Sequence, residues 1–236
     1  MEFHWSILFV LETVGTIAFA SSGAMAAIEQ DLDLLGIIVL GVTAAVGGGM
    51  IRDIIIGNIP PALFLNPVYV WMALITVLIL FMVVRFYPFF LNGTNRNSKF
   101  CPHRNNGVRE NYEKVMNFFD AVGLGTFTAV GIEAAVNAGY GDYSFLSAFL
   151  GVVTGVGGGI LRDIMANQTP FILKKHVYAC ASITGAVCYI LIMNKIPSEL
   201  AMVICSLIVV IIRLLAAKYR WNLPKATRRP IKGDEL

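Results

Sequence analysis

Long apolar stretches separated by short polar turns run through almost the whole chain. Seven of them are predicted to be helices, and they cover residues 5–28, 34–57, 66–87, 115–137, 143–166, 176–194 and 198–217. Each is close to the roughly 20 residues that an α-helix needs to cross the hydrocarbon core of a bilayer. The pattern therefore predicts an all-α integral membrane protein with seven transmembrane helices, embedded in the lipid bilayer.

The polar segments between the stretches set the domain boundaries. The longest, residues 88–114, is predicted to be a solvated cytoplasmic linker. It separates residues 5–87 from residues 115–194, and the last apolar stretch, 198–217, is followed by a basic tail at 218–236. The composition agrees with a membrane protein, because 57% of the residues are hydrophobic and only 14% are charged.

One octapeptide in the second stretch recurs in the fifth. The sequence GGGMIRDI at 47–54 is matched 110 residues later by GGGILRDI at 157–164. Matches continue on both sides, with one gap before Val68, and they include Pro60 with Pro170, Val68-Tyr69 with Val177-Tyr178, Glu12 with Asp120, Gly15 with Gly123 and Phe19 with Phe127. A long match at a fixed period indicates a duplicated unit, here a three-helix repeat followed by a seventh helix.

The basic residues predict how the chain crosses the membrane. With the N-terminus outside, 15 of the 18 Lys and Arg residues, Arg213 among them, lie on the cytoplasmic side, and only Lys195 lies outside. Cytoplasmic loops carry an excess of Lys and Arg, so an outside N-terminus and a cytoplasmic C-terminus are expected. Because three spans are an odd number, the second repeat enters from the opposite side. The two repeats are therefore predicted to be inverted, with a pseudo-two-fold axis in the membrane plane.

The glycine triplets predict where the pathway lies. Each glycine costs about 1 kcal/mol relative to alanine in a helix interior. The second and fifth helices are therefore predicted to break at their triplets and to meet near the midplane. The predicted pathway residues are Gly47, Gly48, Gly49, Arg52, Asp53, Gly157, Gly158, Gly159, Arg162 and Asp163, with Glu12 and Asp120 at opposite pore mouths. The alternative is that the glycines only let helices pack closely, as glycines in membrane helices usually do.

The charged residues after each triplet have two interpretations. A break would free carbonyl groups before it and N–H groups after it, and Asp53 and Asp163 would lie in the favourable first turn of the new half-helix. Arg52 and Arg162 either neutralise these carboxylates, since buried charges are normally paired, or act as a gate or charge filter in the pathway. Both interpretations stay open at the level of sequence.

Several other classes of chemistry have no support in the sequence. The chain contains no Walker loop, GxSxG or HExxH motif, so an enzyme is not expected. Cys101 and His103 are a single pair of potential ligands, whereas structural zinc sites need about four. No metal, cofactor or nucleic-acid partner is therefore predicted.

The doubled Gly-Gly-Gly-x-x-Arg-Asp signature, the two three-span repeats and the seventh span resemble the prokaryotic trimeric intracellular cation channel family, whose domain is also called the glycine transporter domain. The resemblance covers residues 5–217. It implies a homotrimer with one potassium-permeable pore per subunit, lined by the two kinked helices, in the plasma membrane. A carrier of glycine or another small zwitterion is the main alternative, because a broken helix offers partners to both a carboxylate and an ammonium group. A membrane scaffold without transport would not explain paired glycine triplets.

Overall fold

The computed structural model describes residues 6–91, 106–174, 177–219 and 221, and the regular structure of these residues is helical throughout. The long helices are α1 (Ile7–Glu29), α2 (Leu34–Ile56), α4 (Val68–Leu91), α5 (Asn106–Ala135), α6 (Ser144–Met165), α8 (Tyr178–Ile192) and α9 (Ser198–Tyr219). Two four-residue helices, α3 (Ala62–Leu65) and α7 (Phe171–Lys174), follow α2 and α6, and one π-helical turn, Val136–Tyr140, extends α5.

Most of the predicted spans are confirmed as apolar helices. Within the described residues, six helices are long and apolar enough to cross a membrane. The exception is α8, which has 15 residues where 176–194 was expected to be helical. At 1.5 Å per residue it rises about 22 Å, less than the roughly 30 Å of a bilayer core.

Helices extend into the predicted linker from both sides. Helix α4 continues to Leu91 and α5 begins at Asn106, so both helices extend into the expected linker at 88–114. Residues 92–105, with Cys101 and His103, lie outside the described residues. Most of the predicted tail at 218–236 also lies outside them, and its first two residues belong to α9.

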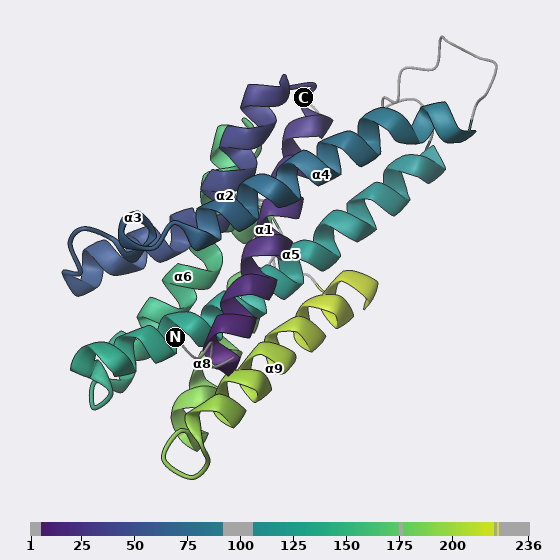
Figure 1. Cartoon of the computed structure of the whole chain (residues 1–236). Helices are drawn as coiled ribbons and strands as arrows, with labels where there is room; N and C mark the ends of the chain where they lie inside the picture. The colour runs from purple at the N-terminus through teal and green to yellow at the C-terminus, as the bar shows by residue number, and fades with distance from the viewer. Residues whose placement is uncertain (1–5, 92–105, 175–176, 220, 222–236) are drawn as a thin grey trace, which may run out of the picture.

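The two repeats fold into matching three-helix units. Helices α1 and α5 pack against each other in the centre, α2 packs on α1, and α6 packs on α5 (Figure 1). The third helices also correspond, since α4 contacts α1 and α2 while α8 contacts α5 and α6. Phe19 of α1 stacks on its repeat counterpart Phe127 of α5, with ring centroids 5.5 Å apart. Helix α9 packs on α5 and α8 and has no counterpart in the first repeat.

The predicted breaks in the second and fifth spans are not present. Helices α2 and α6 both continue through their glycine triplets. They cross at Gly48 and Gly158, where a Cβ atom on either glycine would collide with a backbone carbonyl oxygen of the other helix. Close packing at this crossing offsets the cost of about 1 kcal/mol per helical glycine, because small residues let backbones approach. The triplets are therefore contact surfaces between continuous helices.

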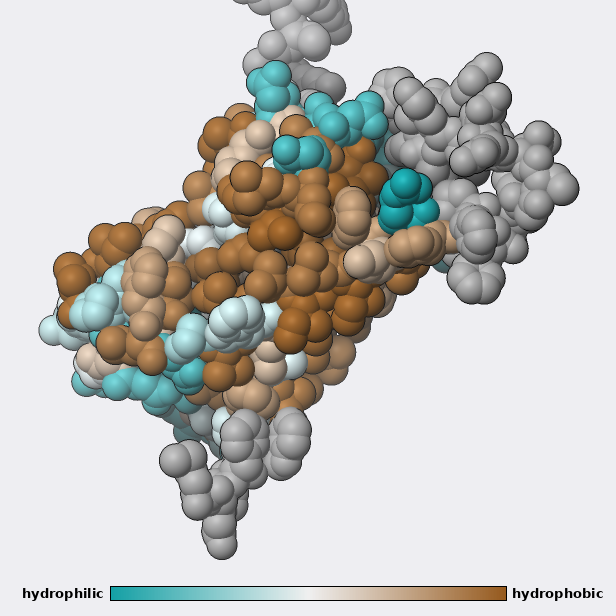
Figure 2. Space-filling model, turned by 45° about the horizontal axis from the view of Figure 1, so that its top comes forward, coloured by the Kyte–Doolittle hydropathy of each residue, from teal (hydrophilic) through white to brown (hydrophobic). Residues whose placement is uncertain are grey.

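The outer surface of the bundle is strongly apolar. Figure 2 shows a broad hydrophobic region across one face, with hydrophilic residues gathered towards its ends. Helix α4 contributes large side chains that are more than half exposed, namely Trp71, Ile75, Ile79, Met82, Val83 and Phe86. An apolar surface of this extent is typical of a protein that contacts lipid or other subunits.

Candidate functional site

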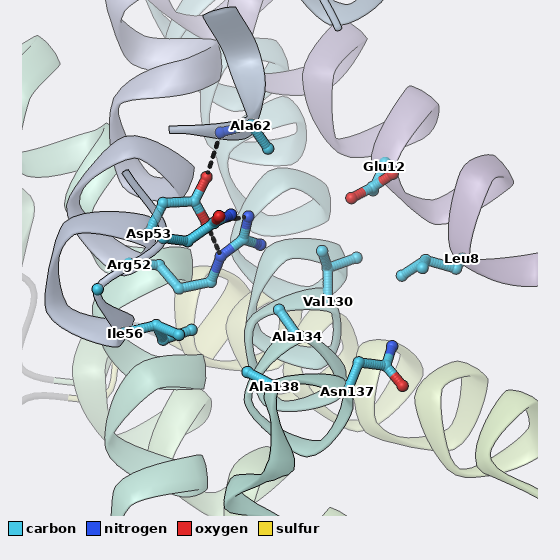
Figure 3. Close-up of a pocket in the computed structure, with 12 residues that line it drawn as sticks. Leu8, Glu12, Arg52, Asp53, Ile56, Ala62, Val130, Ala134, Asn137 and Ala138 are labelled. Atoms are coloured by element: carbon cyan, nitrogen blue, oxygen red, sulfur yellow. Dashed lines mark hydrogen bonds and ion pairs between the residues drawn. The ribbon is translucent and has the colours of Figure 1, made fainter. Parts of the chain in front are cut away.

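A cavity of about 500 Å³ lies between the helices of the first repeat and the end of α5 in the second, and we call it the first-repeat cavity after its charged residues. It is at the end of the bundle where α1 begins and where α2 and α5 end (Figure 3). Its lining comprises Leu8, Glu12, Arg52, Asp53, Ile56, Gly57, Asn58, Ala62, Val130, Ala134, Asn137 and Ala138. The structure thus brings together three of the predicted site residues, Glu12, Arg52 and Asp53. The glycine triplets do not line this cavity.

The Arg52–Asp53 pair is held in place by the chain that follows α2. Arg52 Nε donates a hydrogen bond of 2.9 Å to Asp53 Oδ1. Asp53 Oδ2 accepts one of 2.9 Å from the backbone N–H of Ala62, the first residue of α3. Asp53 lies in the last turn of α2, so its predicted place in the first turn of a half-helix is wrong. The guanidinium and the Ala62 N–H stabilise a carboxylate that the negative end of a helix would otherwise disfavour.

Glu12 lies on the other side of the cavity. Its carboxylate accepts a short hydrogen bond from the Tyr69 hydroxyl of α4. Figure 3 shows the Glu12 carboxylate directed across the pocket towards the Arg52 guanidinium. Within the described residues, Glu12 forms no ion pair. Among the residues that the structure describes, the cavity therefore contains a carboxylate that forms no ion pair, although Arg52 faces it.

The corresponding acid of the second repeat, Asp120, is not at a pore mouth. Its side chain is 0% exposed. Arg162 NH1 donates a 2.7 Å hydrogen bond to Asp120 Oδ1, and Arg213 NH2 of α9 lies 3.4 Å from Oδ2. The Tyr178 hydroxyl also donates to Asp120, over 3.2 Å. Four polar side chains thus form a cluster in the interior, because a buried carboxylate needs partners to be tolerated.

Arg162 is the centre of this buried cluster. Its side chain is 1% exposed, and its Nε donates a 2.8 Å hydrogen bond to Asp163 Oδ1. It also donates to the Ser22 hydroxyl of α1. Asp163, like Asp53, lies in the last turn of its helix and not at the start of a half-helix. Arg162 therefore joins the two carboxylates of the second repeat, whereas Arg52 pairs with one.

One substitution between the repeats distinguishes the open first site from the buried second site. The backbone N–H of Phe171 donates to Asp163 Oδ2 over 2.7 Å, which makes Phe171 the counterpart of Ala62. The Phe171 ring lies 4.8 Å from the Arg162 guanidinium and is buried. A methyl group at Ala62 leaves that volume unfilled. The alignment gap between the repeats was predicted before Val68. The pairing of Ala62 with Phe171 places it earlier, before Pro61.

The two sites also differ in charge. The first contains Glu12, Asp53 and Arg52, so with ionised carboxyl groups it carries one net negative charge. The second adds Arg213, which was expected on the cytoplasmic side but is 4% exposed within α9. That arginine makes the second cluster neutral. A cavity with an excess carboxylate attracts cations, and low-dielectric walls strengthen the field.

Several residues that shape these sites were not predicted to belong to them. Tyr69 and Tyr178 appeared in the repeat match, so their recurrence was the available signal. Arg213 was visible as a charge in an apolar stretch, but its partner could not be identified from the sequence. Glu133, which has no acidic counterpart, is buried and accepts a short hydrogen bond from Tyr189. Among the described residues, no group of three or more His, Cys, Asp or Glu side chains could hold a metal ion.

The sequence is similar to a known protein family and to several bacterial membrane proteins. The family model described as "Glycine transporter" matches residues 9–85 and 117–194, which are the two repeats. The UPF0126 inner membrane protein YadS of Escherichia coli K12 is 32% identical over 220 residues, covering 92% of this chain and 95% of the relative. The UPF0126 membrane protein YvgT of Bacillus subtilis 168 is 31% identical over 225 residues, covering 95% and 98%.

Solved structures share the whole fold. A prokaryotic TRIC channel in 0.5 M KCl has a TM-score of 0.76 at 28% identity, covering 92% of this chain and 98% of that channel. The TRIC trimeric intracellular cation channel orthologue from Rhodobacter sphaeroides has a TM-score of 0.73 at 26% identity, covering 91% and 99%. The doubled motif, the paired three-helix units and these matches together show that the chain belongs to the glycine transporter (UPF0126) family and has the fold of the prokaryotic TRIC cation channels.

Proposed function

We propose that the protein is a homotrimeric channel for monovalent cations, chiefly potassium, with one pore in each subunit. The observation that carries the proposal is Glu12, a carboxylate that lines the first-repeat cavity and forms no ion pair with any described residue. Its charge raises the local concentration of cations, which favours their entry over that of anions. Similar structures support the same conclusion, since they are cation channels and one is trimeric.

In this proposal the cavity is the vestibule at one end of the pore. Beyond the vestibule lies the crossing of α2 and α6, which is closely packed at Gly48 and Gly158 and also has to open for an ion to pass. The buried cluster of Asp120, Arg162 and Arg213 lies in the second repeat and closes the path in the conformation described. An ion cannot pass side chains that are fully buried and paired, so conduction requires this cluster to separate.

The proposal also covers location, orientation and assembly. The protein is a multi-pass component of the plasma membrane, with its N-terminus outside and its C-terminus in the cytoplasm. The E. coli relative is named an inner membrane protein, which supports the proposed location. The bias of basic residues supports the proposed orientation. The apolar outer face of α4 suits contact with lipid or with neighbouring subunits. Mass measurement in mild detergent is expected to give three chains, and monomers under all lipid conditions would contradict the trimer.

A carrier of glycine or another small zwitterion is the second candidate. The cavity favours it in one respect, because Glu12 and Arg52 face each other and could bind an ammonium and a carboxylate group. The family description points the same way. The sequence suggested that the backbone groups of a broken helix would bind the zwitterion. Here two side chains would bind it, so no break in a helix is needed.

Purified protein in liposomes distinguishes the two candidates. A channel is expected to carry potassium down its gradient without taking up glycine, and Glu12→Gln should lower that flux. Glu133→Gln is the matched control, because it neutralises a buried carboxylate that is not part of the cavity lining. Saturable glycine counterflow without potassium flux would reject the channel in favour of the carrier.

A further inference from the structure

The two repeats contain the same four groups in two different arrangements. Each has an acid on its first helix, an Arg-Asp pair at the end of its second and a tyrosine on its third. In the second repeat Arg162 connects both acids by hydrogen bonds, one of 2.7 Å from NH1 to Asp120 Oδ1 and one of 2.8 Å from Nε to Asp163 Oδ1. In the first repeat Arg52 pairs with Asp53 alone, and Glu12 accepts its hydrogen bond from Tyr69. The second repeat thus displays a bridged state that the first has not adopted.

The first repeat has the freedom to adopt the bridged state. The Arg52 side chain is 11% exposed against 1% for Arg162, and it borders a cavity instead of a phenylalanine ring. Glu12 is one methylene longer than Asp120, which extends its reach towards Arg52. Tyr69 need not leave, because Tyr178 bonds to Asp120 while Arg162 does so too. The bridge therefore requires Arg52 and Glu12 to approach each other across the cavity by side-chain rotation.

We propose that Arg52 is the gate of the first-repeat cavity. Its guanidinium moves between the pairing with Asp53 described above and a bridge from Asp53 to Glu12, as in the second repeat. In the bridged state Glu12 is neutralised and the guanidinium occupies the cavity. A permeant monovalent cation competes with this tethered cation for Glu12, a step that rests on the proposed channel function.

The second repeat cannot switch in the same way. Asp120 has two cationic partners, so release of Arg162 would still leave Arg213 beside it. The Phe171 ring fills the space into which Arg162 would move. The gate is therefore asymmetric: Arg52 moves and Arg162 is fixed, although the two belong to the same motif.

Chemical replacement of the guanidinium tests the bridge without depending on transport. Arg52→Ala removes the tethered cation, and methylguanidinium chloride is then added at low millimolar concentration, with sodium chloride as the ionic-strength control. The melting temperature of the detergent-solubilised variant should rise with methylguanidinium, and that of the wild type should not. Adding Glu12→Gln to Arg52→Ala should weaken the apparent affinity at least about tenfold, a loss of roughly 1.4 kcal/mol of binding free energy.

Equal binding to the single and double variants would show that the probe contacts Asp53 only, and would overturn the bridge. No binding to Arg52→Ala would overturn it too. If the alanine variant folds poorly, Arg52→Gln gives a second route because it preserves most of the side-chain volume. It also removes the positive charge that neutralises Glu12 in the bridged state.

Potassium flux in liposomes then tests the gate. Arg52→Ala should raise flux most at low potassium, where the tethered cation competes best, and methylguanidinium should reverse the increase. The same binding pattern without potassium flux in any variant would retain the bridge and reject the channel. Normal flux without the binding pattern would reject the gate and leave the channel in place.

Discussion

Gly48 and Gly158 meet reciprocally where α2 crosses α6. A Cβ atom on Gly48 would collide with the carbonyl oxygen of Thr154, and one on Gly158 with that of Ala44. Thr154 and Ala44 are both four residues before the partner glycine, so the contact obeys the internal two-fold symmetry. The motif was expected to break each helix, but it brings two intact helices into contact.

Alanine at either glycine should therefore destabilise the protein. Overpacking costs about 1–3 kcal/mol, and the better helix propensity of alanine returns only about 1 kcal/mol. Gly48→Ala and Gly158→Ala should lower the melting temperature in detergent by similar amounts, because each Cβ atom would lie equally close to a backbone carbonyl oxygen of the partner helix. Thermal unfolding followed by circular dichroism measures the effect.

Gly49→Ala is the matched control within the same triplet. A Cβ atom there would meet only Arg52 NH2, at 3.8 Å, which is ordinary contact. This variant should be as stable as the wild type or slightly more so. Equal destabilisation by Gly48→Ala and Gly49→Ala would contradict the crossing as the reason for the glycines.

Ala62→Phe should close the first-repeat cavity. It introduces the residue type that its counterpart Phe171 supplies in the second repeat, where the ring covers the arginine. Potassium flux in liposomes should fall by about tenfold or more, equivalent to at least 1.4 kcal/mol on the barrier. The protein should fold normally, because Ala62 lines the cavity and is exposed.

Leu65→Phe enlarges another side chain of α3 that is not in the cavity lining. It should leave the flux unchanged. If both variants retain full flux, the cavity does not belong to the pathway.

Asp120→Asn should be far more damaging than Glu12→Gln, although the repeat equates the two acids. Asparagine at Asp120 leaves Arg162 and Arg213 buried without that carboxylate, and breaking a buried pair costs about 3–5 kcal/mol. Glutamine at Glu12 can still accept the hydrogen bond from Tyr69, so the loss there should be about 1 kcal/mol or less. Denaturation of the two variants in detergent gives the comparison.

A reversed order of stability would mean that the buried cluster does not hold α5, α6 and α9 together. Glu133→Gln again serves as a control, since its amide can accept from Tyr189 as the carboxylate does.

The predicted orientation can be tested at the turn between α8 and α9. A single cysteine at Asn194, in a variant without the native cysteines, should react with an impermeant maleimide added outside intact cells. Labelling from the cytoplasmic side alone would invert the topology. The orientation would then have to be explained against the distribution of lysine and arginine.

The sequence by itself determined the helices, the duplication and the candidate site residues. Apolar length predicted the spans, because a bilayer demands about 20 apolar residues whatever their neighbours are. The repeated GGGxxRD motif located the crossing of α2 and α6 and both Arg-Asp pairs. These features are local or periodic, so they can be recognised without knowing which helices touch.

Tertiary structure decided what the motif does. The cost of helical glycine is local and favours a break, whereas the contact that outweighs it joins Gly48 to Gly158 across 110 residues. Likewise, Glu12 and Asp120 match in sequence, yet Arg213 of α9 lies 3.4 Å from Asp120, whereas no cation among the described residues forms an ion pair with Glu12. Ala62 and Phe171 occupy equivalent positions. The small alanine side chain borders a cavity, whereas the phenylalanine ring covers the buried Arg162. Burial and pairing depend on all the surrounding helices, so no single stretch of the chain encodes them.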